Sequence, residues 1–457
     1  MTGTGSGTGS GAATGVLRRA RHSFAVPAPG RITVSARSLL SAPGDPGRTA
    51  TRTSRFVGSL FVAVLLLQRI AVPGLPAVSV LVPVALVWTA WGLHRGLLEL
   101  DRTRLVFWCV AAGGCALAVC AQFALVRDPI VSPTSWALLV TVWLPVVCRL
   151  RTRTREVFVA SLRVVVTAAT VLAAGCLVMM ATQFAGVPYR DHLAAVVPAR
   201  YLLQDFIITY PVTYGSDLYR ANAWIGLEPS MVSYQLGIGL LAAVLVGARW
   251  WIVLVLVGGL IAATSGSGLF LIAVGVVVIL LHRARGSLVR YVPVTIGALL
   301  MLYLFPWSEH ILSRVGEVAD GSSSASLRGI TPYGYLWPTW VGDPMAVLFG
   351  RGAGSSQQLV TDSGILGLLV STPIKIFFDY GLVFGALLAA FLVHVYVGGP
   401  SRAFSISLFV SLWALQPGTT TSVVIIPLIL VVTWWAPRVG DALEDRAEPR
   451  TAGRWSL

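Results

Sequence analysis

Long apolar segments alternate with short hydrophilic connectors from residue 56 to residue 437 of this 457-residue chain. A helix needs about 20 mostly apolar residues to cross the hydrocarbon core of a bilayer, and most of the segments approach that length. The pattern predicts an all-α polytopic membrane protein with about twelve transmembrane helices in one domain. We expect these spans near residues 56–72, 75–93, 105–126, 131–149, 160–186, 231–248, 250–264, 266–282, 290–306, 379–397, 403–417 and 421–437.

The composition excludes an ordinary soluble protein. Hydrophobic residues make up 56% of the chain and charged residues 12%, whereas a soluble domain is roughly a quarter charged. The net charge of +15 does not indicate a nucleic-acid-binding protein, because the basic residues cluster in short connectors and no polar domain is present to carry them. Lys375 is the only lysine.

The arginines also predict the orientation of the chain in the membrane. Cytoplasmic connectors are enriched in basic residues, and the basic connectors here lie between alternate spans, at residues 94–104, 149–155, 249, 282–290 and 402. With these connectors inside, both termini are cytoplasmic, and the two long loops 187–230 and 307–378 are outside. The second loop separates spans nine and ten, and loops of such length are usually functional or disordered. Their aromatic, charged and glycine residues favour function.

The two ends of the chain are hydrophilic. Residues 1–55 begin with a Gly/Thr/Ser run and continue as an Arg-rich stretch that cannot bury a core, which predicts a disordered cytoplasmic tail. Residues 438–457 predict a second, shorter cytoplasmic tail. The five cysteines form no CxxC pair and no Cys/His pattern with metal-site spacing. We therefore expect no metal and no cofactor.

The first candidate cluster covers residues 219–230, just before span six. Arg220 and Glu228 lie there at the edge of the membrane, where ionisable groups are costly unless they are paired or hydrated. Two interpretations remain open. The two residues form a structural ion pair, or Arg220 binds an anion while Glu228 orients it or acts as a base.

The second cluster is the outer turn Thr264–Gly268 between spans seven and eight, which contains Ser265 and Ser267. Small hydroxyl residues at such a turn can donate hydrogen bonds to a sugar or a phosphate. They also allow helices to pack closely, and the sequence does not separate these two roles.

The third cluster lies in the larger outer loop and carries Arg328, several aromatic residues and a glycine-rich stretch around Arg351. Glycines let backbone N–H groups approach an anion, and the forked guanidinium of arginine fits phosphate oxygens. The alternative is an ordinary Gly-rich turn. Lys375 follows at the start of span ten, either as a snorkelling anchor or as a cation for a lipid head group.

Taken in order, these pieces resemble the O-antigen ligase and polymerase superfamily of bacterial membrane glycosyltransferases. The shared layout is an arginine followed by G-x-E-P-S before a mid-chain span, and a serine-containing turn two spans later. An S-x-R motif then precedes a Phe-Gly-x-Gly-x-Gly-Ser stretch, and Asp379-Tyr380-Gly381 opens the next span. The resemblance covers most of residues 56–437, although its motifs are concentrated in residues 219–268 and 322–381.

The resemblance implies a GT-C-like fold in the bacterial cytoplasmic membrane and a donor glycan linked to undecaprenyl pyrophosphate. The glycan would be transferred on the outer face to a glycan or lipid-linked acceptor, without a metal or nucleotide sugar. Arginines bind the pyrophosphate in this family, and Arg220 and Arg328 match them, with looser matches at Arg351 and Arg314. The His-Asn pair of the ligases is not evident before span ten, which favours a polymerase and leaves the general base open, with Glu228 as the candidate.

Two other classes compete with a glycosyltransferase. A secondary transporter also has about twelve spans with both ends inside, and residues 96–104 resemble the loop between spans two and three of the major facilitator group. That match fails, because its Gly-to-Asp spacing is one residue too long and its second glycine is missing. Such transporters also usually carry their long loop on the cytoplasmic side. The third class is a membrane scaffold without catalysis.

Overall fold

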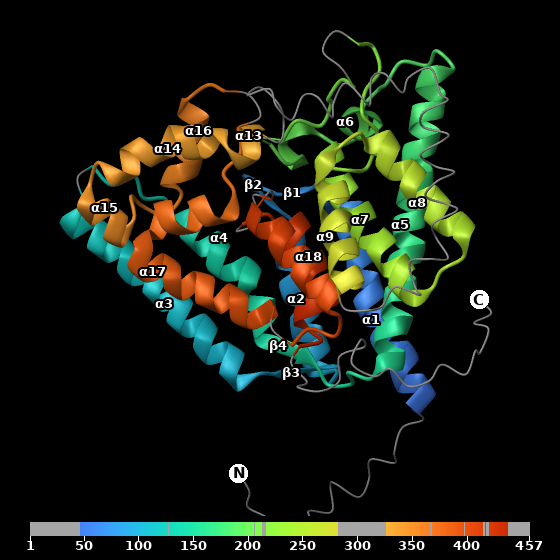
Figure 1. Cartoon of the computed structure of the whole chain (residues 1–457), viewed down its shortest axis with the longest axis horizontal. Helices are drawn as coiled ribbons and strands as arrows, with labels where there is room; N and C mark the ends of the chain where they lie inside the picture. The colour runs from blue at the N-terminus through green and yellow to red at the C-terminus, as the bar shows by residue number, and fades with distance from the viewer. Residues whose placement is uncertain are drawn as a thin grey trace, which may run out of the picture. The chain divides into compact units, whose positions relative to one another are not determined.

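The computed structural model in Figure 1 describes residues 46–126, 128–204, 206–212, 216–281, 326–365, 368–396, 398–414, 416 and 420–436. The expected span 290–306 and Arg314 lie outside these residues. So do residues 1–45 and 438–457 of the two expected tails. For residues 46–49 and for Arg328 only the backbone is described.

The described residues are mainly helical. The N-terminal part contains α1 (Pro46–Leu67), β1 (Ala71–Val72), β2 (Leu75–Ser79), α2 (Leu81–His94), β3 (Leu98–Leu100), α3 (Arg102–Leu125), α4 (Pro133–Trp143), β4 (Cys148–Leu150) and α5 (Arg155–Phe184). The middle contains α6 (His192–Val196), α7 (Pro229–Val246), α8 (Trp250–Ala263) and α9 (Gly266–Leu281). The C-terminal part contains α13 (Ser326–Gly329), α14 (Thr331–Val341), α15 (Pro344–Phe349), α16 (Ser355–Asp362), α17 (Thr372–Tyr396), α18 (Arg402–Ala414) and α19 (Ser422–Leu428), which continues as a π-helical turn over Ile429–Thr433.

Five of these helices are long and apolar enough to cross a membrane: α1 from residue 50, α3, α5, α7 and α17. Six shorter apolar helical segments coincide with further expected spans. Apolar helix is therefore present at eleven of the twelve predicted positions, and the remaining one falls outside the described residues. An all-α membrane protein is the class that this fold defines, and the predicted helical membrane architecture is confirmed at that level.

Two details of the sequence prediction are wrong. Residues 46–55, which we expected in the unstructured tail, form the first turns of α1. The span expected from residue 379 begins earlier, at Thr372, as α17, which is broken at Gly381, where φ is 71° and ψ is 179°. The four short strands, which pair as β1–β2 and β3–β4, were also not expected; they join helix ends and do not form a separate layer.

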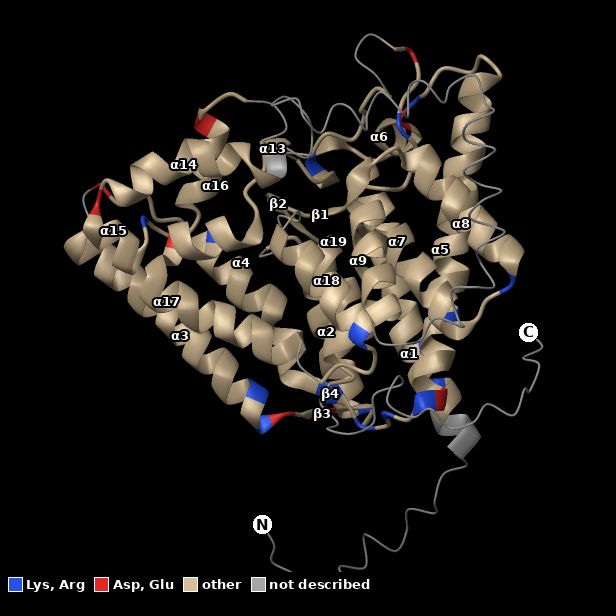
Figure 2. Cartoon of the chain, in the orientation of Figure 1, with Lys and Arg blue, Asp and Glu red and all other residues tan. Residues whose placement is uncertain are grey.

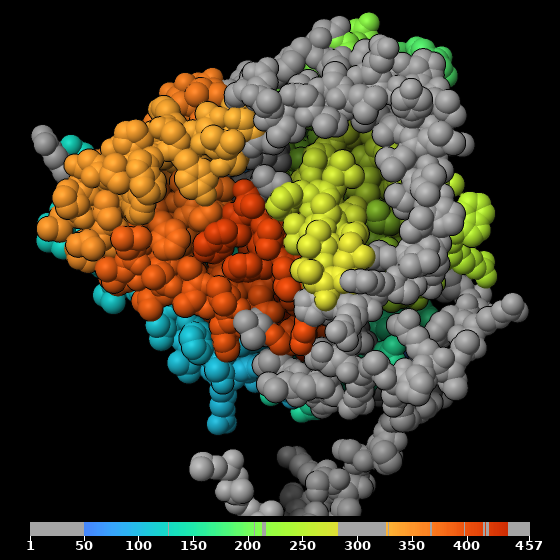
Figure 3. All heavy atoms as spheres, viewed as in Figure 1, coloured from blue at the N-terminus to red at the C-terminus, as the bar shows by residue number. Residues whose placement is uncertain are grey.

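The central helices, α5, α7, α8 and α9, pack closely through small residues. A Cβ added at Gly239 of α7 would lie 2.3 Å from Ala169 Cβ of α5, and one added at Gly268 of α9 would lie 2.0 Å from the Ser233 carbonyl oxygen. Close approach of this kind is the usual way in which membrane helices gain packing energy, because lipid offers no hydrophobic drive between them. Of the 18 residues of α7, 83% are buried inside the protein. The space-filling view shows α18 lying against α9 on this face (Figure 3).

Two of the basic connectors, 94–104 and 149–155, meet at one end of this domain (Figure 2). Strand β3, in the connector 94–104, pairs with β4, and Arg149 donates to Glu99 at 2.8 Å and to Asp101 at 3.2 Å. Arg104 donates to the carbonyl oxygen of Ala436 at 2.7 Å. The long loop 187–230 and helix α13 lie toward the other end. Two connectors that the charge pattern assigned to one side of the membrane therefore lie together, although the identity of that side stays a prediction.

Candidate functional site

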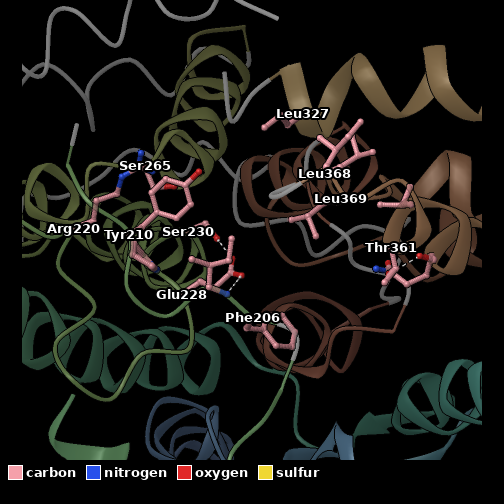
Figure 4. Close-up of a pocket in the computed structure, with 16 residues that line it drawn as sticks. Phe206, Tyr210, Arg220, Glu228, Ser230, Ser265, Leu327, Thr361, Leu368 and Leu369 are labelled. Atoms are coloured by element: carbon pink, nitrogen blue, oxygen red, sulfur yellow. Dashed lines mark hydrogen bonds between the residues drawn. The ribbon is translucent and has the colours of Figure 1, made fainter. Parts of the chain in front are cut away.

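A cavity of about 510 Å³ opens between the central helices and the segment after residue 326. Three separate parts of the sequence line it, namely the loop before α7, the turn before α9, and the segment formed by α13, α16 and the chain that follows α16. Figure 4 shows their side chains converging on this space. The lining residues are Phe206, Ile207, Tyr210, Arg220, Glu228, Pro229, Ser230, Ser265, Leu327, Gln357, Val360, Thr361, Gly364, Ile365, Leu368 and Leu369. Arg220, Glu228 and Ser265 of the first two predicted clusters are among them, and Leu327, next to Arg328, is the contribution of the third.

Arg220 is held in the polar wall by its own loop. Its Nε donates to the carbonyl oxygen of Pro211 at 3.2 Å, and its guanidinium lies 4.3 Å from the centre of the Tyr210 ring. The backbone N–H of Arg220 also donates to the Tyr210 carbonyl at 2.9 Å, which extends the short bridge between Pro211 and Tyr219. With only 7% of the residue exposed, the guanidinium is aligned by stacking before any ligand arrives.

Glu228 occupies the N-cap position of α7, and Pro229 begins the helix. One carboxylate oxygen accepts from the Ile207 N–H at 3.2 Å and the other from the Ser230 hydroxyl at 2.9 Å. The carboxylate lies at a helix N-terminus, where the helix dipole favours negative charge. Arg220 and Glu228 therefore share one cavity, and both of the interpretations that the sequence allowed for them stay open.

The serine turn before α9 packs closely against α7, and the hydrogen bonding to a ligand that the sequence also suggested stays a prediction. Ser267 donates to the Ser230 carbonyl at 2.6 Å, and Ser233 of α7 donates to the Ser265 carbonyl at 2.9 Å and accepts from the Gly268 N–H at 3.1 Å. Ser267 is thus buried between α7 and α9 and is absent from the lining of the cavity. Ser265 does line the cavity, because the contacts of Ser233 and Ser267 hold the turn against α7.

The opposite wall of the cavity is mainly apolar, with Gln357 and Thr361 of α16 as its polar members. Leu327 comes from α13, Val360 from α16, and Ile365, Leu368 and Leu369 from the chain between α16 and α17. The figure shows Leu327, Leu368 and Leu369 across the space from Tyr210, Arg220 and Glu228 (Figure 4). The cavity therefore offers a cation and hydroxyl groups on one side and a hydrocarbon surface on the other, an arrangement that suits an amphipathic ligand.

The backbone N–H groups of the glycine-rich stretch bind a carboxylate of the protein itself, that of Asp379. Asp379 is fully buried and accepts from the backbone N–H of Gly354 at 2.9 Å, from that of Ser356 at 2.9 Å and from the Ser355 hydroxyl at 3.2 Å. Lys375 lies 3.4 Å from the same carboxylate. The backbone nest predicted for a ligand is thus filled by Asp379.

This arrangement revises two predicted binding residues. Lys375 is buried against Asp379, so it is neither a snorkelling anchor nor a cation available at the surface. Arg351 forms hydrogen bonds through its backbone: its N–H donates to the Phe378 carbonyl at 2.8 Å, and its carbonyl accepts from the Ile130 N–H at 3.1 Å. Neither residue lines the described cavity. Asp379 fastens the start of α16 to α17, and the backbone of Arg351 fastens the preceding loop to α17.

The remaining two predicted arginines cannot be placed in this way. Arg314 lies outside the described residues. The backbone of Arg328 belongs to α13, next to Leu327, which lines the cavity. The prediction that Arg328 contacts the ligand therefore stands as a prediction.

Sequence analysis missed Arg69, which is fully buried at the end of α1. Its Nη1 donates to Asp191 at 2.8 Å and to the carbonyl oxygen of Trp224 at 3.1 Å. Burial by itself would raise the pKa of Asp191, but the hydrogen bonds from Arg69 and from the Ala194 N–H outweigh it and hold that pKa below its ordinary value. The available signal was an arginine at the end of an apolar span, which usually has a specific partner.

A second, smaller pocket of about 250 Å³ lies between α14 and α17. Its lining is apolar and aromatic, with Trp337, Trp340 and Phe377 among its members. The Trp340 indole N–H donates to the Ala346 carbonyl at 3.0 Å, so the ring presents only its apolar surface to this pocket.

Among the described residues, no group of three or more His, Cys, Asp or Glu side chains could hold a metal ion. Comparison with models of known protein families, with curated proteins and with solved structures returned no match.

Proposed function

We propose that the protein is a membrane glycosyltransferase similar to the O-antigen ligases and polymerases, with polymerisation as the favoured reaction. It would extend or transfer glycan units linked to undecaprenyl pyrophosphate on the outer face of the bacterial cytoplasmic membrane. The observation that carries this proposal is the cavity, which gathers Arg220, Glu228 and Ser265 opposite a mainly apolar wall. The order of the sequence motifs is its second support.

The chemistry follows from the two walls. The guanidinium of Arg220 would bind pyrophosphate oxygens, while the apolar side packs against the first isoprene units of the carrier. An acceptor hydroxyl attacks the anomeric carbon of the donor, so that a new C–O bond forms and the bond to the pyrophosphate oxygen breaks. The lipid pyrophosphate leaves with the bonding electron pair, and an aligned cation stabilises the negative charge that develops on it.

Glu228 is the candidate group for the proton that the acceptor hydroxyl loses. Its carboxylate already accepts two hydrogen bonds, from Ile207 and Ser230, which orient its oxygens at the cavity wall. A base must lie within hydrogen-bond reach of the proton that it removes, and Glu228 lines the same cavity as Arg220. Ser265 is positioned to donate to a sugar hydroxyl or a phosphate oxygen.

Purified full-length protein in lipid nanodiscs, given a lipid-pyrophosphate-linked oligosaccharide, should lengthen it without added nucleotide or divalent metal. Product length is measured by mass spectrometry, and Glu228→Gln serves as the variant with an impaired base. Transfer of the glycan to a separate acceptor without elongation would indicate a ligase. Unchanged donor, together with proton-coupled uptake of a small solute in liposomes, would contradict the proposal in favour of a transporter.

A further inference from the structure

The turn that carries Glu228 to the cavity has an unusual backbone. Ala223 and Trp224 have φ angles of 53° and 59°, in the left-handed region that residues other than glycine rarely adopt. Glu228 follows four residues after Trp224 as the N-cap of α7. A backbone in this region persists only where its surroundings impose it, so the contacts made by the turn decide where Glu228 lies.

Arg69 makes one of these contacts from outside the cavity. Its two terminal nitrogens donate to the two carboxylate oxygens of Asp191, and Nη1 also donates to the Trp224 carbonyl at 3.1 Å. The Arg69 side chain is 1% exposed. One guanidinium thus joins the end of α1, the start of α6 and the left-handed turn. The forked geometry of arginine permits this, whereas a lysine ammonium is a single point charge.

Uncharged groups hold the other parts of the same loop. Gln183 of α5 accepts from the Tyr219 N–H at 2.7 Å and donates to the Tyr219 carbonyl at 3.0 Å. Asn222 accepts from the Trp224 N–H at 3.0 Å and donates to the Ile208 carbonyl at 3.3 Å. These contacts fix the backbone next to Arg220, and Arg69 fixes the Trp224 end, from which the chain continues to Glu228.

We propose that Arg69 and Asp191 form a positioning pair, which holds the left-handed Ala223–Trp224 turn and so sets the placement of Glu228 in the cavity. Neither member of the pair lines the cavity, so the pair acts through the turn. The ligand used below rests on the proposed function, whereas the contact between the pair and the turn does not.

The test compares full-length wild-type protein in nanodiscs with Arg69→Lys and Asp191→Asn. Arg200→Lys is the matched control, because Arg200 is an exposed arginine of the same loop that stacks on Tyr201 at 4.8 Å. One readout is amide hydrogen exchange of residues 219–228, with residues 372–396 as an internal reference. The other is the affinity for farnesyl pyrophosphate, a short soluble probe of the proposed site.

Both pair variants should raise exchange in residues 219–228 at least tenfold, leave residues 372–396 unchanged, and weaken probe binding at least tenfold. The control should do neither. The double variant should weaken probe binding no more than the more strongly affected single variant does, because both changes release the same contact. Where Arg69→Lys does not accumulate, Asp191→Asn carries the test, since Asp191 is the more exposed partner at 21%.

Unchanged exchange in residues 219–228 in the pair variants would overturn the positioning role. An equal rise in residues 372–396 would also overturn it, because that result indicates general loss of stability. Wild-type protein that fails to bind the probe would instead contradict the proposed function, and the exchange measurement would then decide the positioning role by itself.

Discussion

At the scale of single residues, Arg220 is the group on which the proposed chemistry depends most directly. It stacks on Tyr210 and is anchored through Nε to Pro211, which leaves the plane of its guanidinium fixed at the cavity wall. Lysine would keep the charge but lose both the stacking and the planar fork. We therefore expect Arg220→Lys to lower glycan transfer more than tenfold, or about 1.4 kcal/mol of transition-state stabilisation, as measured by initial rates of elongation.

The control for this prediction is Arg200→Lys, which removes an arginine that is also stacked on a tyrosine but lies outside the cavity lining. Its transfer rate should stay within about twofold of wild type, and both variants should accumulate normally in the membrane. A second comparison is Arg328→Lys. If both arginines bind one pyrophosphate, the fold loss in elongation rate of the double variant is smaller than the product of the two single-variant losses. Near-wild-type elongation by Arg220→Lys would refute the role of this residue.

At the scale of elements, the close packing of α15 against the break in α17 depends on the absence of a side chain at Gly381. At Gly381, where α17 is broken, an added Cβ would lie 2.3 Å from the Leu348 carbonyl oxygen, and φ is 71°. Gly381→Ala should lower the free energy of unfolding by more than the roughly 1–3 kcal/mol typical of left-handed strain alone, because the clash adds to it. Thermal unfolding in detergent measures the loss.

Gly74→Ala separates the two causes. Gly74 also has a positive φ, 81°, but nothing lies within 4 Å of the Cβ that alanine would add. This variant should show the conformational cost without the steric one, and its melting temperature should therefore fall less than that of Gly381→Ala. Equal decreases in melting temperature would show that the contact between α15 and the break in α17 does not contribute to stability.

At the scale of the whole molecule, orientation is the prediction with the widest consequences. The cavity can act on an outer-leaflet donor only if loop 187–230 is outside. In a cysteine-free background, Val196→Cys and Gln358→Cys should react with an impermeant maleimide added to intact cells, because both positions are exposed and lie on the expected outer side. Arg151→Cys, in the basic connector, should react only after the membrane is permeabilised. The reverse labelling pattern would place the cavity in the cytoplasm and exclude the proposed reaction.

The sequence by itself determined the class of protein and the approximate positions of its helices. Apolar length and charge placement are local properties that the bilayer imposes on each segment. A segment such as α5, expected at residues 160–186 and found at Arg155–Phe184, could therefore be predicted without knowledge of its neighbours. The sequence also identified Arg220, Glu228 and Ser265 as candidates, and these residues meet at one cavity.

Tertiary structure decided which candidate groups face the cavity and which are used internally. A glycine-rich turn presents the same N–H groups to a ligand or to a carboxylate of the chain, and only folding brings Asp379 into the turn and Lys375 beside it. The contact of Arg69 with Trp224 joins residues 155 positions apart. Hydrophobic period and charge pattern carry no information about such distant pairs, because the approach of the two segments depends on how the helices pack.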